Sequence, residues 1–202
     1  MSPRIIADET VYRGWVSLRR MTVQMPDGRP EERHVEDHGS AVAVLPYDPV
    51  RRTALLVSMP RAPVLLSGQP DLLEAIAGRI EDTTPEDTAR REAMEEAGVR
   101  LTLLDPVANI WTMPSISTER VQLYLAPFGA GDRIAPGGGA ADENEGIVVH
   151  ELTLERLATL ADAGDLQDAK TMLLVQALRM RRADLFRTAT QPADRSRRDT
   201  GA

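Results

Sequence analysis

The sequence predicts an α+β fold, in which helices cover a sheet and a small β region comes first. Three observations support this prediction. Strand-like segments lie on both sides of one strongly marked helix, two amphipathic segments follow near the end, and no regular βαβ alternation runs through the chain. The length of 202 residues suits one substantial domain with a small appendage.

The first half of the chain contains three segments with strand patterns. Residues 10–25 alternate between apolar and polar side chains and predict a strand, which ends at the turn Pro26-Asp27-Gly28. A charged stretch over residues 30–39 follows. The apolar run 40–48 predicts a buried strand, and residues 53–59 predict the strand that pairs with it.

The second half combines one central helix, further strands and a helical end. We expect a short apolar segment at 72–78, a helix over 85–97, strands within 99–113, 120–128 and 147–152, and helices over 152–164 and 169–186. The tail, residues 188–202, has no apolar periodicity and is expected to be disordered.

The helix over 85–97 has clear signals at both ends. Thr84 is the expected N-cap, Pro85 stands at the first helical position, and Asp87 completes a T-x-x-D capping pattern. Gly98 supplies the stop.

Three glutamates share one face of this helix. Glu92 and Glu96 are four residues apart, and Glu95 is three from Glu92. Like charges at this spacing destabilise a helix by about 0.2–0.5 kcal/mol, and they also oppose the dipole near its C-terminus. A divalent cation would reverse this effect, because carboxylate oxygens are what Mg²⁺ binds. The alternative is a solvated helix laced by ion pairs such as Arg91 with Glu95.

The composition excludes several classes of site. The chain has no cysteine, so disulfides and thiolate metal sites are excluded and a cytoplasmic location is expected. A net charge of −7 argues against a nucleic-acid surface, and neither a signal peptide nor a membrane span is expected. The three histidines, His34, His38 and His150, lack zinc-ligand spacing and are interpreted as structural or surface residues. No G-x-S-x-G elbow is present, and Gly137-Gly138-Gly139 lacks the G-K-[ST] of a P-loop.

The segment from Gly78 to Val99 resembles the Nudix box, G-x5-E-x7-R-E-U-x-E-E-x-G-U, where U is aliphatic. Residues 91–99, REAMEEAGV, match its second half. Two departures stand out. The box is one residue short between Gly78 and Arg91, and a threonine replaces its first glutamate. The shorter spacing is similar to that of GDP-mannose-type Nudix hydrolases.

Residues 10–185 also resemble bacterial ADP-ribose pyrophosphatases. The segments that carry this resemblance include YRGWVSL, AVLPYDPVR, STER and GGAADENEGIVVHEL. It implies a Nudix α/β/α sandwich with a mixed sheet over residues 41–187. It also implies an N-terminal β region over residues 1–40 that contacts substrate and exchanges with a second subunit in a domain-swapped homodimer.

The resemblance further implies the roles of individual residues. Glu92 and Glu96 would bind metal with help from Glu95, joined by the carbonyl of Ala77 and by Glu145. Arg91 would orient the glutamates, and Glu143 would be the base that activates water. Substrate contacts would come from Arg61, Trp15, Tyr12 and Glu119. The alternatives are a solvated acidic loop around Glu143, a surface arginine at 61, and aromatic side chains that only fill core.

These residue types suit hydrolysis of a diphosphate, which clustered negative charge protects from nucleophiles. Mg²⁺, with Mn²⁺ able to substitute, would neutralise that charge and activate water. The function expected is Mg²⁺-dependent hydrolysis of ADP-ribose to AMP and ribose 5-phosphate. GDP-mannose or another nucleoside diphosphate sugar is the alternative substrate, and a non-catalytic nucleotide sensor is an alternative from another class. The intact box carboxylates argue against the sensor.

Overall fold

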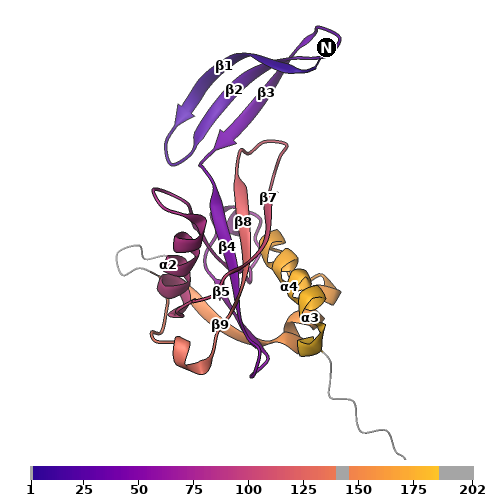
Figure 1. The fold of residues 1–202 in the computed structure, drawn as a ribbon. Coiled ribbons are helices and arrows are strands. Elements are labelled where there is room, and N and C mark those ends of the chain that lie inside the picture. The colour runs from indigo at the N-terminus through magenta and orange to yellow at the C-terminus, as the bar shows by residue number, and fades with distance from the viewer. Residues whose placement is uncertain (1, 140–145, 187–202) are drawn as a thin grey trace, which may run out of the picture.

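The computed structural model describes residues 2–139 and 146–186, and it consists of a small N-terminal sheet and a larger sandwich (Figure 1). The small sheet is antiparallel, in the order β1-β2-β3, and contains β1 (Arg4–Arg13), β2 (Ser17–Gln24) and β3 (Pro30–Asp37). Every residue of β1 is exposed. Figure 1 shows this sheet beyond one end of the sandwich, connected to it by the start of β4.

The single strand predicted over residues 10–25 is wrong, because the chain reverses direction within it. The amide of Gly14 donates to the carbonyl of Val16 at 2.9 Å in a tight turn between β1 and β2. The charged stretch 30–39 contributes β3, which has no apolar face to mark it as a strand. The predicted turn over residues 26–28 is confirmed, with Gly28 N donating to Met25 O at 2.9 Å.

The central sheet is mixed, as predicted. Its main path runs β7-β8-β4-β5-β9, and β6 pairs with β4. The neighbours β4 and β8 are parallel, whereas the other pairs are antiparallel. The strands are β4 (Ala41–Asp48), β5 (Thr53–Ser58), β6 (Ile76–Arg79), β7 (Asp105–Trp111), β8 (Arg120–Pro127) and β9 (Val148–Thr153).

Helices cover both faces of this sheet, which confirms the predicted sandwich (Figure 1). On one face lies α2 (Pro85–Ala97), and on the other lie α3 (Leu154–Ala163) and α4 (Ala169–Arg181). Alternate residues of β4 point to opposite faces. Val42 and Val44 therefore pack in the α2 cluster, and Ala43 and Leu45 pack in the α3–α4 cluster.

Three further details differ from the expectation. The strand expected within 99–113 begins only at Asp105, and the helix expected over 169–186 ends at Arg181, followed by a 3-10 turn, Ala183–Phe186, that buries Leu185. The short helix α1 (Ala62–Leu66) was not anticipated, and a 3-10 turn spans Ala130–Asp132. The tail 188–202 lies outside the described residues. Within the described part of the chain, no helix has the length and apolar character needed to cross a membrane.

Candidate functional site

The ends of α2 are formed by the residues that the sequence marks for them. The hydroxyl of Thr84 accepts a hydrogen bond from the amide of Asp87 at 3.1 Å and donates to the Asp87 carboxylate at 2.9 Å. Pro85 occupies the first turn, and Gly98 adopts the left-handed conformation with a φ of 64°. The predicted N-cap and C-cap are therefore confirmed, and they place the box glutamates in the last turns of α2.

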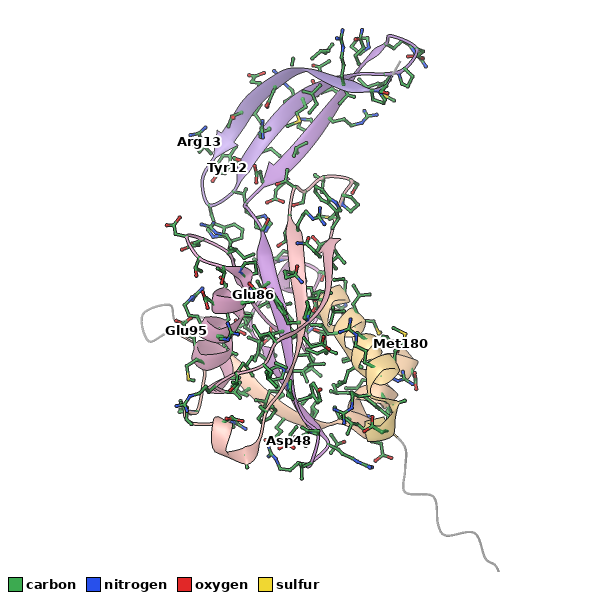
Figure 2. All side chains as sticks on the ribbon, viewed as in Figure 1. Tyr12, Arg13, Asp48, Glu86, Glu95 and Met180 are labelled. Carbon is green, nitrogen blue, oxygen red and sulfur yellow. The ribbon has the colours of Figure 1, made fainter. Side chains whose placement is uncertain are left out.

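Arg91 lies between two of these glutamates. Its guanidinium donates to Glu92 at 2.6 Å and to Glu95 at 2.6 Å. Burial acts to lower the pKa of Arg91, but the charges and hydrogen bonds of both carboxylates outweigh burial and raise this pKa. Figure 2 shows Glu95 on the side of α2 that faces away from α3 and α4. Arg91 therefore bridges the carboxylates of Glu92 and Glu95.

Glycine at position 78 makes room for Glu92. Gly78 lies in β6, beside α2, and a Cβ at this position would lie 2.5 Å from the Cγ atom of Glu92 and closer still to its carboxylate. The backbone of β6 at Gly78 thus leaves a space, termed here the cradle, that holds the Glu92 side chain. A larger residue at position 78 would fill this space. Glu96 is more enclosed, since only 4% of this residue is exposed.

A cavity of about 660 Å³, termed here the acidic cavity, opens beside these residues. Ala77, Gly78, Glu92 and Glu96 line it together with Arg91. The carbonyl of Ala77 and the two carboxylates are hard oxygen donors, the kind that Mg²⁺ and related cations accept. This set of oxygen donors fits a divalent cation, and the cradle at Gly78 gives the Glu92 side chain the room that it needs to belong to the set.

The described residues do not complete a metal site on their own. Within residues 2–139 and 146–186, no group of three or more His, Asp or Glu side chains converges closely enough to hold a metal ion. Two of the predicted site residues, Glu143 and Glu145, lie outside the described residues. A phosphate oxygen of a substrate can supply further ligands to a Mg²⁺ ion bound by only one or two carboxylates.

A second cavity, of about 370 Å³, shares Trp15, Arg61, Ala77, Gly78 and Arg79 with the acidic cavity. At its wall, Arg61 donates to both oxygens of the buried Glu74, at 2.8 and 3.1 Å. Lys170 lies 3.7 Å from Glu74 and 2.7 Å from Asp168. Arg61 therefore faces the cavity from a fixed position, as a contact to a diphosphate would require.

Sequence reasoning missed Glu74, Asp168 and Lys170 as pocket residues. One signal was available, because Lys170 is the only lysine among the 24 basic residues of the chain. The ion pair of Lys170 with Glu74 joins segments that are far apart in the sequence.

The two predicted aromatic contacts have different surroundings. Trp15 is 76% exposed and lines the acidic cavity, the second cavity, and a third one of about 410 Å³ that also includes Arg13 and Gly39. Tyr12 is also exposed, but it lies on the N-terminal sheet away from α2 (Figure 2) and does not line any of these three cavities. Neither ring fills core, and the structure brings only Trp15 to the cavities.

Glu119 belongs to a polar cluster at the edge of the second cavity. One of its oxygens lies 3.0 Å from Nε2 of His38, and the other accepts from the hydroxyl of Thr112 at 2.6 Å. Nδ1 of His38 contacts the carboxylate of Glu36. The ring of His38 stacks on Trp15. His38 therefore contacts both Trp15 and Glu119, two of the residues predicted to bind substrate.

Comparison with known proteins identifies relatives along most of the chain. The family described as NUDIX domain matches residues 37–175. The chain is 33% identical to the GDP-mannose pyrophosphatase of Cronobacter sakazakii (strain ATCC BAA-894), over 90% of this chain and 97% of that protein. It is 36% identical to the ADP-ribose pyrophosphatase of Escherichia coli (strain K12), over 87% of each. A crystal structure of an ADP compounds hydrolase superposes with a TM-score of 0.73 at 18% identity, covering 91% of this chain and 96% of that one, which shows the shared fold.

Proposed function

The chain belongs to the Nudix family, and from this premise we propose that it hydrolyses the diphosphate of a nucleoside diphosphate sugar, with ADP-ribose converted to AMP and ribose 5-phosphate. One observation carries the proposal. The box carboxylates Glu92 and Glu96 line the same cavity as the cationic Arg61. A cleft with carboxylates on one wall and a guanidinium on another suits a metal-bound diphosphate.

The metal that we propose is Mg²⁺, with Mn²⁺ able to substitute. When bound, such an ion neutralises diphosphate oxygens and lowers the pKa of a coordinated water. Glu92, Glu96 and the carbonyl of Ala77 would hold it, with Glu95 assisting and with Glu145 as a further contact.

The remaining residues position the reactants. Arg91 holds the carboxylates of Glu92 and Glu95 in place through its two hydrogen bonds. Arg61, fixed by Glu74, would bind the diphosphate. Glu143 would take the proton from the attacking water, which requires it to be ionised, and a nearby cation favours that state.

GDP-mannose is the second candidate substrate. Two observations favour it: the box is one residue short, and a relative named GDP-mannose pyrophosphatase is matched over 97% of its length. The two candidates share the proposed metal site and differ in the base and the sugar, so they need to be compared directly.

We also propose that the chain forms a homodimer through its N-terminal sheet. All ten residues of β1 are exposed, including the apolar side chains of Ile5, Ile6 and Val11. An exposed strand with apolar side chains is a ready surface for a second chain. Light scattering coupled to size exclusion should give the mass of two chains for the parent, and deletion of residues 1–38 should give the mass of one.

The test of function is a substrate panel. ADP-ribose, GDP-mannose, ADP-glucose and NADH are incubated separately with the chain and Mg²⁺, and the products are separated by chromatography. We expect AMP from ADP-ribose, with a higher kcat/KM than for the other three. GMP from GDP-mannose at a higher kcat/KM would make the second candidate the function.

Glu96→Gln tests the metal assignment. We expect its kcat/KM to fall by at least about 100-fold, because even groups that only support a metal ligand are worth roughly 10- to 100-fold. Glu155→Gln, at an exposed glutamate of α3, is the matched control and should retain parent activity. Parent activity in Glu96→Gln would show that the metal assignment is wrong.

A further inference from the structure

His38 lies where the N-terminal sheet joins the sandwich. It follows the last residue of β3, and its imidazole is largely enclosed. Nδ1 faces the carboxylate of Glu36, and Nε2 faces Glu119 at 3.0 Å. One face of the ring stacks on Trp15, with the ring centroids 5.3 Å apart and the planes 18° from parallel. His38 thus contacts β3, the β7–β8 connection and the β1–β2 turn at once.

The two carboxylates require His38 to donate from both nitrogens. A neutral imidazole has one N–H and one lone pair, so with both glutamates ionised its lone pair would face an acceptor. An imidazolium donates to both, and hydrogen bonds between charged groups are the stronger ones. Burial acts to lower the pKa of His38, but the hydrogen bonds and charges of Glu36 and Glu119 outweigh burial and raise this pKa above its ordinary value of 6.5.

Other charged groups also face this position. The pKa of Asp37 in β3 is lowered mainly by the hydrogen bond from Thr118, and the nearby charge of His38 contributes a smaller part. Asp37 accepts from the hydroxyl of Thr118 at 2.8 Å. The second cavity is also lined by charged residues of both signs: Arg61, Glu74, Arg79, Asp168 and Lys170. The charged groups in direct contact with His38 are the carboxylates of Glu36 and Glu119, and they favour its protonated form.

The indole of Trp15 lies at the cleft and stacks on His38. Trp15 lies in the turn between β1 and β2, and it lines all three cavities together with Arg79. His38 covers one side of the indole, while the residue as a whole stays 76% exposed. A cation against an aromatic face is attractive, so the charge of His38 strengthens this stack.

The surrounding sheet is anchored independently of His38. The amide of Glu36 donates to Ile116 O at 2.7 Å, and the amide of Thr118 donates to Glu36 O at 3.0 Å. Loss of the proton from His38 therefore removes one hydrogen bond and weakens the stack, while these backbone bonds keep β3 in place. The expected consequence is local, and it falls on the indole of Trp15.

We propose that His38, as an imidazolium held between Glu36 and Glu119, is a positioning residue that fixes the indole of Trp15 as a stacking platform for the nucleotide base. Base binding then weakens when His38 loses its proton. This inference rests on the proposed function, because it assumes a nucleotide in the cleft. An exposed aromatic ring that is held in one orientation is a suitable platform for any base.

Tryptophan fluorescence tests the contact without any measurement of activity. The chain has two tryptophans, so Trp111→Phe leaves Trp15 as the only one. A protonated imidazole quenches a stacked indole more than a neutral one does. Emission of Trp111→Phe should therefore rise with pH, with a midpoint above 6.5. A titration without this rise overturns the proposal.

Three variants in the Trp111→Phe background assign the titrating group. His38→Gln should abolish the rise, because glutamine does not titrate. Glu36→Gln should move the midpoint to lower pH, because one anionic partner is lost. His34→Gln is the matched control, at an exposed histidine within β3, and should leave the midpoint unchanged. A rise that survives in His38→Gln overturns the proposal.

Kinetics of ADP-ribose hydrolysis with Mg²⁺ test the role in binding. At pH 6.5 we expect His38→Gln to raise KM roughly tenfold, within the range for loss of one base–aromatic stack, with kcat changed less than twofold. Near pH 9 the two KM values should converge. A KM equal to that of the parent at pH 6.5, or a loss confined to kcat, overturns the proposal. Failure of the proposed function would look different, as an absence of turnover in the parent at every pH.

Discussion

Replacement of Gly78 by alanine tests whether the cradle for Glu92 matters. The new Cβ would lie 2.5 Å from Cγ of Glu92. Carbon atoms in contact sit about 3.5–4.0 Å apart, so the Glu92 side chain has to move by roughly 1 Å or more. A misplacement of about 1 Å at a catalytic centre is worth on the order of 100-fold in rate. We therefore expect kcat/KM for ADP-ribose to fall about 100-fold, with weaker apparent Mg²⁺ affinity.

The same substitution should leave the fold in place. Gly78 is not among the glycines with positive φ, so alanine can adopt its backbone conformation. Crowding of this kind costs about 1–3 kcal/mol. Reduced freedom of the unfolded chain offsets about 0.4–1 kcal/mol of that cost. The free energy of unfolding should therefore fall by no more than about 2.6 kcal/mol.

The assay combines initial rates over a range of Mg²⁺ and ADP-ribose concentrations with urea denaturation. Gly131→Ala is the matched control, because a Cβ at Gly131 meets no heavy atom within 4 Å and its φ is not positive. This control should keep both the activity and the stability of the parent. If Gly78→Ala hydrolyses ADP-ribose as fast as Gly131→Ala, the position of Glu92 does not govern catalysis and the reasoning fails.

Three further predictions concern stability. Thr84→Ala should lower the free energy of unfolding by about 1 kcal/mol in urea denaturation through loss of the N-cap, with kcat unchanged. Glu74→Gln should lower it by about 2 kcal/mol, less than for a fully buried pair because the Arg61 side chain is 42% exposed, and should raise KM for ADP-ribose. Burial acts to raise the pKa of Asp168, but the charge and hydrogen bond of Lys170 and the hydrogen bonds from Thr171 together outweigh burial and lower this pKa below 3.8. The contribution of Asp168 to stability is therefore lost as the pH falls below 3.8. Urea denaturation should show a shallower loss of stability in Asp168→Asn over that range.

Local chemistry made α2 predictable from the sequence. An N-cap, a first-turn proline and a C-terminal glycine act on backbone groups within a few residues, so Thr84, Pro85 and Gly98 could be assigned without knowledge of the fold. The shared face of Glu92 and Glu96 follows from helical geometry in the same way. The apolar strands β4 and β5 were also recognisable, because both of their faces are buried.

Features that depend on tertiary structure could not be predicted. The β1–β2 turn interrupts an alternating pattern that both strands share, so the hairpin resembled one strand. The strand β3 packs against no core and has no apolar face to mark it. The contact of His38 with Glu119 joins residues 81 positions apart, and no local signal links them.

The three box glutamates differ in their exposure to solvent, and the stability of α2 alone does not explain this difference. Their side chains are 33% exposed at Glu95 and 13% at Glu92, and the whole residue is 4% exposed at Glu96. Negative charge near the C-terminus of a helix is unfavourable, and burial of a carboxylate is more so. Arg91 compensates Glu92 and Glu95, the two nearest the surface, by direct hydrogen bonds. Glu92 and Glu96 line the same cavity despite these costs. Departures of this kind from what favours local stability are expected where function requires them.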